Sequence, residues 1–307
     1  MASVPGFYSS ENLGFRCAHA LAAGEDGGLR ISRQLSKAKL VPIDDAGFAK
    51  IAAYFEYKRA PLNARVVKRT EAEAWILEEI AFDSNDGPVT AYLFLPKNRK
   101  PPYQVIHFVP AGDVEGGYRT LLASIELRLT PLVRSGRAVF SVLLSGYIGR
   151  PNPRAGGNLT REDRVDAVVD RIADLRRGID YLVSRPDIDK ERIGFWGPSA
   201  GGSLGMLAGA LEHRYRSFAV NGVGYQRPSS DPRIEIVNFV PRITMPKLIQ
   251  NGRWDETVPL ETSAQPMFDL MREPKRLTIY DGGHVPTPEV LIPTLNGWFD
   301  ETMGPVR

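Results

Sequence analysis

One stretch of the sequence has residue types and spacing that could support nucleophilic chemistry. Gly197, Ser199 and Gly201 form the pattern G-x-S-x-G directly after a short apolar stretch, residues 193–196. The pattern predicts a sharp turn from a strand into a helix, because small neighbours let a serine take a strained backbone conformation. A helix over residues 203–208 would point its N-terminus, with its N–H groups and dipole, at that serine. Ser199 is therefore the candidate nucleophile.

A serine nucleophile needs a base that takes its proton, and the chain has four histidines. His19 lies in the N-terminal tail, and His213 stands in a charged stretch where it is expected to be solvated. His107 lies within an apolar run, which indicates a hydrogen-bonded core histidine. His284 follows the last expected strand in a loop with two glycines, residues 280–286, which can bring the imidazole over the sheet edge. His284 is therefore the candidate base.

The carboxylate that orients this base is expected in the loop that follows the strand at residues 247–250. Asp255 is the candidate because it lies in that loop, whereas the adjacent Glu256 would point elsewhere. Asp281 is too close in sequence to His284 to reach its far ring nitrogen easily. The alternative interpretation of Asp255 is a turn-stabilising residue.

Two N–H donors are needed to stabilise an oxyanion, and the sequence offers candidates for both. Ala200 directly follows the serine, and Gly112 is preferred in the loop after the strand at residues 105–109. Four aromatic residues on loops expected at the carboxyl edge of the sheet are candidates to line the substrate pocket, with ordinary packing as the alternative for each: Tyr147, Tyr225, Phe239 and Trp254.

Strand-like and helix-like segments alternate around these positions. An antiparallel hairpin is expected at residues 75–82 and 89–96, and the clearest helix at residues 163–183, which carry one apolar stripe. A helix with Pro131 as an internal flaw or break is expected at residues 121–133. The alternation predicts an α/β fold with a mostly parallel central sheet and helices on both faces. A short lid segment is expected at residues 224–243.

Composition excludes several classes of protein. The formal net charge of +3, from 39 basic and 36 acidic residues, is too balanced to indicate a nucleic-acid partner. The single cysteine, Cys17, excludes an intramolecular disulfide and a thiolate metal cluster, and the spaced histidines of a zinc site are missing, so neither kind of metal site is expected. Without an apolar span or a signal-like leader, we expect no membrane insertion and a cytoplasmic location.

The domain boundary is expected near residue 41. Residues 1–41 are rich in Ser, Gly and Ala and lack periodicity, which indicates a linker or the remnant of an upstream domain, followed by one α/β domain over residues 42–307. A helix expected from Asp44 has an apolar stripe that must pack against this domain or against a second copy of the chain, so a homo-oligomer stays open: Phe48, Ile51, Ala52 and Phe55.

The combined pattern resembles the α/β-hydrolase superfamily, whose nucleophile, carboxylate and histidine follow the chain order of Ser199, Asp255 and His284. The nearest branch is that of dienelactone hydrolases, acetyl xylan esterases and prolyl-oligopeptidase-like enzymes. The resemblance implies hydrolysis of a small-molecule ester through an acyl-enzyme intermediate, without metal or cofactor. Residues 109–112, Val-Pro-Ala-Gly, depart from the His-Gly or His-Gly-Gly of many members, which leaves the second oxyanion donor open.

Three short segments carry a further resemblance. Residues 61–65, 91–98 and 100–104 resemble the hydrolase module at the C-terminus of some large bacterial serine/threonine-kinase-like proteins, a similarity that covers about residues 42–307. Residues 12–17 resemble the closing strand of formylglycine-generating-enzyme-like domains, with a plain tail as the alternative.

Three functions are therefore weighed. A carboxylic-ester hydrolase is the leading one. A prolyl-oligopeptidase-like serine peptidase would use the same three residues, but about 40 poorly patterned residues cannot build the propeller domain that such enzymes usually carry. A non-catalytic sensory or binding module of a kinase-linked protein would have no need of the serine, the histidine and the aspartate together.

Overall fold

The computed structural model describes residues 40–85, 87–111, 129–146, 150, 159–226, 229 and 231–306. The chain divides into two units, residues 1–34 and 35–307, and the first lies wholly outside the described residues. The fold below is that of the second unit.

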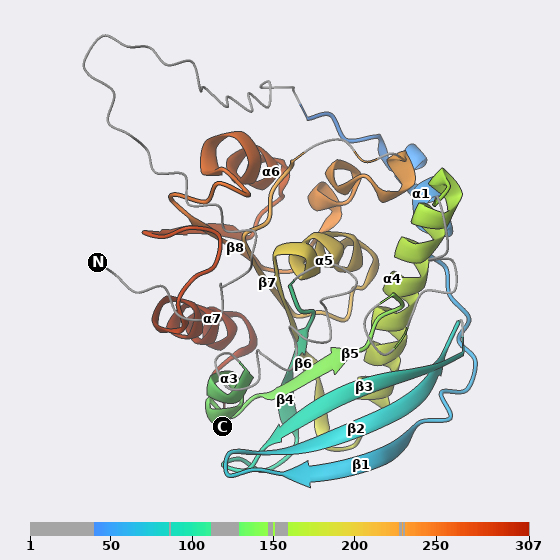
Figure 1. Ribbon diagram of the computed structural model, residues 1–307, viewed down its shortest axis with the longest axis vertical. Coiled ribbons are helices and arrows are strands. Elements are labelled where there is room, and N and C mark those ends of the chain that lie inside the picture. Colours follow the sequence, from blue (N-terminus) through green and yellow to red (C-terminus); the bar gives the residue numbers. More distant parts are fainter. Residues whose placement is uncertain are drawn as a thin grey trace, which may run out of the picture. The chain divides into compact units, whose positions relative to one another are not determined.

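A nine-stranded sheet forms the framework of the described residues (Figure 1). The strand order is β1-β2-β3-β5-β4-β6-β7-β8-β9. The pairs β1/β2, β2/β3 and β3/β5 are antiparallel, and every other neighbouring pair is parallel. The strands are β1 (Arg65–Glu71), β2 (Trp75–Ser84), β3 (Gly87–Pro96), β4 (Tyr103–Phe108), β5 (Ala138–Val142), β6 (Ile188–Pro198), β7 (Ser217–Asn221), β8 (Lys247–Gly252) and β9 (Lys275–Tyr280).

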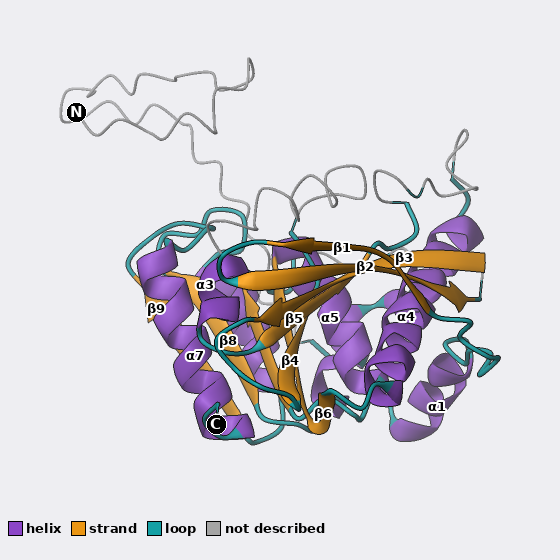
Figure 2. Cartoon of the chain, turned by 90° about the horizontal axis from the view of Figure 1, so that it is seen from below, coloured by secondary structure: helices purple, strands orange, loops and turns teal. Residues whose placement is uncertain are grey.

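Helices cover both faces of this sheet (Figure 2). The buried side chains of α4 and α5 pack on one face, and those of α3 and α7 pack on the other. The helices are α1 (Asp45–Ala53), α3 (Thr130–Arg134), α4 (Arg161–Ser184), α5 (Ser199–Leu211), α6 (Gln265–Leu270) and α7 (Pro288–Met303). The predicted fold class, a mostly parallel sheet between two layers of helices, is confirmed.

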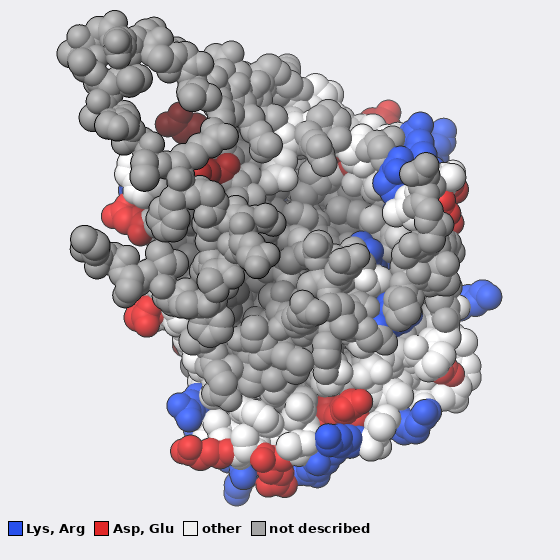
Figure 3. All heavy atoms as spheres, in the orientation of Figure 1, with Lys and Arg blue, Asp and Glu red and all other residues white. Residues whose placement is uncertain are grey.

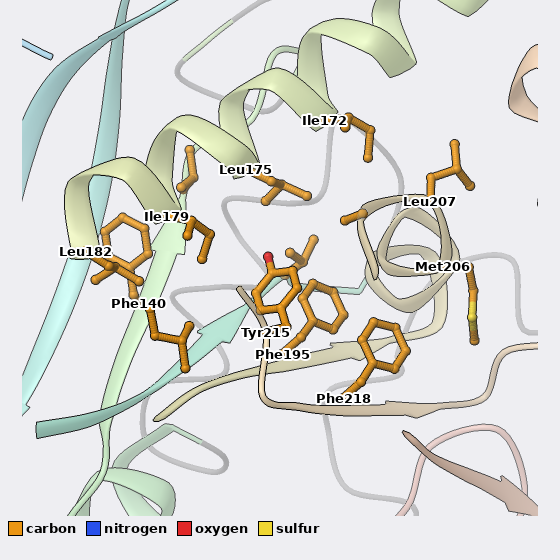
Figure 4. Packing of buried hydrophobic residues seen from close by; sticks show 14 of the residues in the cluster. Phe140, Ile172, Leu175, Ile179, Leu182, Phe195, Met206, Leu207, Tyr215 and Phe218 are labelled. Atoms are coloured by element: carbon orange, nitrogen blue, oxygen red, sulfur yellow. The ribbon is translucent and has the colours of Figure 1, made fainter. Parts of the chain in front are cut away.

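The parallel strands are apolar because both of their faces are buried. Successive residues of β4 point to opposite sides, so that Val105 joins the cluster under α4 and α5 while Ile106 joins the cluster under α3 and α7. Within the first cluster, Figure 4 shows Phe195 and Phe218 between the side chains of α4 and α5. Their rings stack with centroids 4.8 Å apart, which joins β6 firmly to β7.

The edge strand β1 has no counterpart in the sequence-based expectations. All seven of its residues are exposed, and its charged side chains obscure the alternation that identifies a strand. Basic and acidic side chains mix along the lower edge in Figure 3, where β1 and β2 lie. Such charges discourage the unpaired edge from adding another strand.

Two segments differ from their expected form. In the predicted helix over residues 121–133, Pro131 lies in the first turn of α3, where a missing N–H is tolerated, and residues 121–128 lie outside the described part. The expected lid at residues 224–243 contains three short 3₁₀ turns, η3 (Pro232–Ile234), η4 (Ile236–Asn238) and η5 (Val240–Arg242). Phe239 and Val240 belong to the hydrophobic core, so this part of the segment is packing rather than a cover.

Helix α1 packs against its own chain. The rings of Phe48 and Phe55 meet the ring of Phe239 edge-on, with centroids 5.3 Å and 5.7 Å away. Arg242 donates a hydrogen bond of 2.7 Å to the carbonyl of Ile43, just before the helix. The apolar stripe predicted from the sequence therefore packs on its own chain without needing a second copy, with Ile51 and Phe55 buried and Phe48 partly buried.

We expect a chain that starts near Arg59 to be strongly destabilised. Such a chain loses α1 and uncovers Phe239, and the lost apolar burial corresponds to on the order of 5 kcal/mol in the free energy of unfolding. A chain that starts near Val41 keeps α1 and should keep the melting temperature. Thermal melts with gel filtration check both chains, and equal melting temperatures would contradict the packing role of α1.

A second packing feature is the fully buried His107 on β4. Its Nδ1 lies 2.8 Å from the hydroxyl of Tyr215, and its ring contacts those of Phe140 and Phe195. The core histidine expected from the sequence is confirmed. Burial lowers the pKa of the His107 imidazole from 6.5 to about 3, because the charged form is poorly solvated there.

This histidine should make the domain sensitive to acid. Below about pH 6.5 the unfolded chain binds a proton that the folded chain excludes, so the free energy of unfolding falls by about 1.4 kcal/mol per pH unit. The loss continues to about pH 3 and reaches about 5 kcal/mol. The free energy of unfolding, measured by urea titration at several values from pH 7 to pH 4, should fall less steeply with decreasing pH in the double variant His107→Leu/Tyr215→Phe than in the native protein. An equal pH dependence in the two proteins would contradict this account.

Candidate active site

Ser199 lies at the junction between β6 and α5. Its φ angle of +49° falls in the left-handed region, which a residue with a side chain rarely adopts. This is the strained turn predicted from the G-x-S-x-G pattern. Helix α5 begins at Ser199 itself and not at Ser203 as expected, because Gly201 and Gly202 continue the helix while buried against the sheet.

The turn packs directly on the end of β4, and this contact explains one of its glycines. A Cβ atom at Gly201 would lie 2.1 Å from the carbonyl oxygen of Val109, so no other residue fits without moving the backbone. The serine is thereby held beside the loop that leaves β4 at Pro110 and Ala111. Gly112, the expected second oxyanion donor, follows in that loop and lies outside the described residues.

The structure brings Ser199, His284 and Asp255 into one line of hydrogen bonds. His284 Nε2 lies 2.9 Å from Ser199 Oγ, and His284 Nδ1 lies 2.8 Å from Asp255 Oδ2. The three residues follow β6, β9 and β8, whose carboxyl ends share one edge because these strands are parallel. The imidazole can therefore receive a proton from the serine while the carboxylate holds its other nitrogen.

The Asp255 carboxylate is fully buried and uses both of its oxygens. Oδ1 accepts hydrogen bonds from the backbone N–H groups of Thr257 at 2.9 Å and Val258 at 2.8 Å, and Oδ2 faces His284. The side chain is 0% exposed, whereas that of His284 is 22% exposed. The Asp255 carboxylate thus has both roles considered from the sequence. Oδ1 stabilises the turn, and Oδ2 contacts His284.

Neither of the other two acidic candidates is among the hydrogen-bond or ion-pair partners of His284 in the described part of the chain. Glu256 is exposed, and the exposed Asp281 forms an ion pair of 2.8 Å with Arg253.

Neighbouring backbone holds the His284 loop in place. Tyr280 donates its hydroxyl to the carbonyl of Gly283 at 2.6 Å, and the N–H of Trp254 donates to the carbonyl of Gly282 at 2.9 Å. Gly222, just after β7, has a φ angle of +61°, and a Cβ atom there would lie 2.8 Å from Cε1 of His284. The sequence alone does not single out Gly222, because its role depends on a residue far along the chain.

The other site residues predicted from the sequence are the oxyanion donor and the pocket residues, and they differ in how exposed they are. Ala200 is exposed in the first turn of α5, beside the serine. Tyr225 is half-buried; burial, and next the nearby Glu235, raise the pKa of its phenol, so the hydroxyl stays neutral. Trp254 is 69% exposed next to Asp255. Tyr147 lies outside the described residues.

Phe239 requires a correction. It was expected to line the pocket, but its side chain is 0% exposed and is covered by Phe48 and Phe55 of the α1 region. The alternative of ordinary packing holds for this residue. The sequence could not separate the two roles, because the helix that covers the ring lies far away along the chain.

Neither a metal-binding cluster nor a membrane-spanning helix occurs in the described part of the chain. No group of three or more His, Cys, Asp or Glu residues there could hold a metal ion. Each helix in the same ranges is too short or too polar to span a bilayer.

The fold and the position of the serine turn define the protein as one with an α/β-hydrolase fold. Among solved structures, the acetyl xylan esterase 1 of Thermoanaerobacterium sp. JW/SL YS485 superposes with a TM-score of 0.64 at 16% identity, over 85% of this chain and 95% of that one. The acetyl xylan esterase of Paenibacillus sp. R4 gives a TM-score of 0.62 at 20% identity, over 83% and 94%. The α/β hydrolase GrgF of Penicillium sp. sh18 gives 0.58 at 15% identity, over 74% and 99%. At these identities the likeness concerns the fold.

Similarity in sequence is more limited. The Bacillus subtilis (strain 168) protein "Putative hydrolase YtaP" is 26% identical over 169 residues, which are 52% of this chain and 56% of that protein. The match therefore spans little more than half the length of this relative. No family model matches the chain.

We expect Gly222→Ala to slow the reaction of Ser199 with a fluorophosphonate by at least about tenfold, because the new methyl group displaces the His284 ring. The positive φ angle adds a cost of about 1–2 kcal/mol to folding. Gly297→Ala in α7 is the matched control, since a Cβ there meets no atom within 4 Å. Labelling rates followed by mass spectrometry check this, and equal rates in the two variants would contradict the close packing of Gly222 on His284.

Proposed function

We propose that the protein is a serine-dependent carboxylic-ester hydrolase. The observation that carries the proposal is the line of hydrogen bonds from Asp255 through His284 to Ser199, at a strained strand-to-helix turn of an α/β-hydrolase fold. Esterases among the structural neighbours agree with this function, as does the name of the curated relative.

In the proposed reaction Ser199 Oγ attacks the ester carbonyl carbon while its proton passes to His284 Nε2. The carbonyl double bond becomes a single bond to an oxyanion, and the tetrahedral intermediate collapses as the C–O bond to the alcohol breaks. His284 returns the proton to the leaving alcohol and then takes one from water, which attacks the acyl carbon. As the bond between that carbon and Ser199 Oγ breaks, His284 gives its proton to Oγ, so the acid is released and the free serine is restored. Asp255 holds the imidazole and stabilises its cationic form.

The oxyanion in this scheme needs donors beside the serine. The N–H of Ala200 lies in the first turn of α5, where the free N–H groups and the helix dipole favour negative charge. We assign Ala200 as one donor and keep Gly112 as the proposed second donor, on the loop that follows the contact between Gly201 and Val109. Tyr225 and Trp254 remain the proposed pocket residues.

The two alternative functions differ from this proposal in what Ser199, His284 and Asp255 would do. A prolyl-oligopeptidase-like peptidase would use the three residues on an amide, and a binding module of a kinase-linked protein would use none of them chemically. The resemblance to kinase-linked modules and the domain boundary near residue 41 stay predictions.

We expect Ser199→Ala to remove nearly all hydrolysis of p-nitrophenyl esters, with a loss of about 10⁶ in kcat, since no other group can form the acyl-enzyme. Ser203→Ala, at an exposed position of the same helix, is the matched control and should keep full activity. Fluorophosphonate should label the native protein and the control but not Ser199→Ala. Turnover of Ser199→Ala close to that of the native protein would overturn the assignment.

The same preparations separate the alternatives. A series of esters of graded acyl length, assayed beside peptide anilides, distinguishes an esterase from a peptidase. A native protein that neither hydrolyses any of them nor reacts with fluorophosphonate would be the binding module.

A further inference from the structure

We propose that Asn251 is a positioning residue that holds the Asp255 loop in the geometry needed for catalysis. The proposal rests on the proposed function, because it assigns Asn251 a part in the same site. The hydrogen-bond partners of the Asn251 side chain are backbone carbonyls and include neither Ser199 nor His284. Its effect therefore passes through the loop between β8 and the π-helical turn η6 (Leu260–Ala264).

The first observation is a polar side chain where packing alone would favour an apolar one. Asn251 lies on β8, between β7 and β9, and is 0% exposed. Earlier residues of the same strand, Leu248 and Ile249, enter the two hydrophobic clusters of the core. Burying an amide is costly unless its groups find partners, and among the described residues only the NH₂ group of Asn251 finds them, since Oδ1 has no hydrogen-bond partner there. The position therefore calls for a specific role of that NH₂ group.

The second observation is the choice of partners. Asn251 Nδ2 donates to the carbonyl of Gly252 at 3.1 Å and to the carbonyl of Val258 at 3.0 Å. These two carbonyls stand on either side of Asp255 in the chain. Because carbonyl oxygens only accept hydrogen bonds, the amide must present its NH₂ group to both of them. The side chain therefore ties together the two ends of the loop that carries the carboxylate.

The loop held by Asn251 is hydrogen-bonded to Asp255, which in turn contacts His284. The N–H of Val258 donates to Asp255 Oδ1 at 2.8 Å, and Asp255 Oδ2 lies 2.8 Å from His284 Nδ1. A shift of Val258 thus shifts the carboxylate, and with it the imidazole that faces Ser199. On the exposed side of the loop, Gln226 Nε2 donates a hydrogen bond of 2.9 Å to the carbonyl of Thr257.

This arrangement predicts an effect on the chemical step and not on substrate binding. The Asp255 side chain is fully buried, so neither it nor Asn251 offers surface to a substrate. The carboxylate matters most when His284 becomes cationic, which happens only as the reaction proceeds. Loosening the loop should therefore lower kcat and leave KM nearly unchanged.

The test compares Asn251→Ala with Asn251→Thr in the full chain. The alanine variant loses both donors and should lower kcat by about 10- to 100-fold, with KM within about twofold of the native value. Threonine is similar in size, suits a strand and has one donor, so it should fall between alanine and the native protein. It also serves as the second variant if the alanine variant folds poorly.

A matched control comes from a second buried asparagine. Asn238 is 4% exposed and also binds two backbone groups, since its Oδ1 accepts from the N–H of Ile43 and its Nδ2 donates to the carbonyl of Pro232. Asn238→Ala should lose comparable stability but keep kcat. If kcat of Asn251→Ala lies within about twofold of this control, or if only KM changes, the proposal is overturned.

A spectroscopic measurement makes the test independent of ester turnover. The proton on His284 Nδ1 that points to Asp255 should give a downfield NMR signal in protein with ¹⁵N-labelled histidine. That signal should persist in Asn238→Ala and should move or broaden in Asn251→Ala. An unchanged signal in Asn251→Ala overturns the positioning role. If the native protein shows neither turnover nor labelling, the proposed function fails, while this comparison still decides the role of Asn251.

Discussion

Burial of the Asp255 carboxylate is the constraint on which the site depends. A carboxylate without exposed surface loses its hydration, so each oxygen must find donors within the protein. The N–H groups of Thr257 and Val258 satisfy Oδ1, which leaves Oδ2 for His284 Nδ1. The orientation of the imidazole toward Ser199 is therefore built into the folded chain and does not have to be created by a substrate.

The parallel sheet brings the three residues of the site together. Strands β6, β8 and β9 run in the same direction, so the loops that carry the serine, the aspartate and the histidine leave one edge. Apolar packing on both faces holds the strands in register, as the stacked rings of Phe195 and Phe218 show. Where backbone must approach backbone or ring closely, at Gly201 and Gly222, the chain has no side chain at all.

The sequence-based expectations succeeded where the signal is local and failed where it is not. The alternation of apolar runs located the inner strands, and the hydrogen-bonded core position of His107 followed from its apolar neighbours. Strand β1 was missed because every one of its side chains is exposed. Phe239 was misplaced because the rings that cover it come from the α1 region, nearly two hundred residues earlier in the chain.

The sequence by itself determined the fold class, the strained serine turn and the chain order of the three candidate catalytic residues, because periodicity, small residues and order are properties of neighbouring positions. Only the tertiary structure decided that Ser199 Oγ meets an imidazole 85 residues away at 2.9 Å, and that α1 packs on its own domain. It alone showed Asn251 between the two ends of the Asp255 loop. Such contacts depend on strand register and burial, which join distant segments and leave no periodic trace in the sequence.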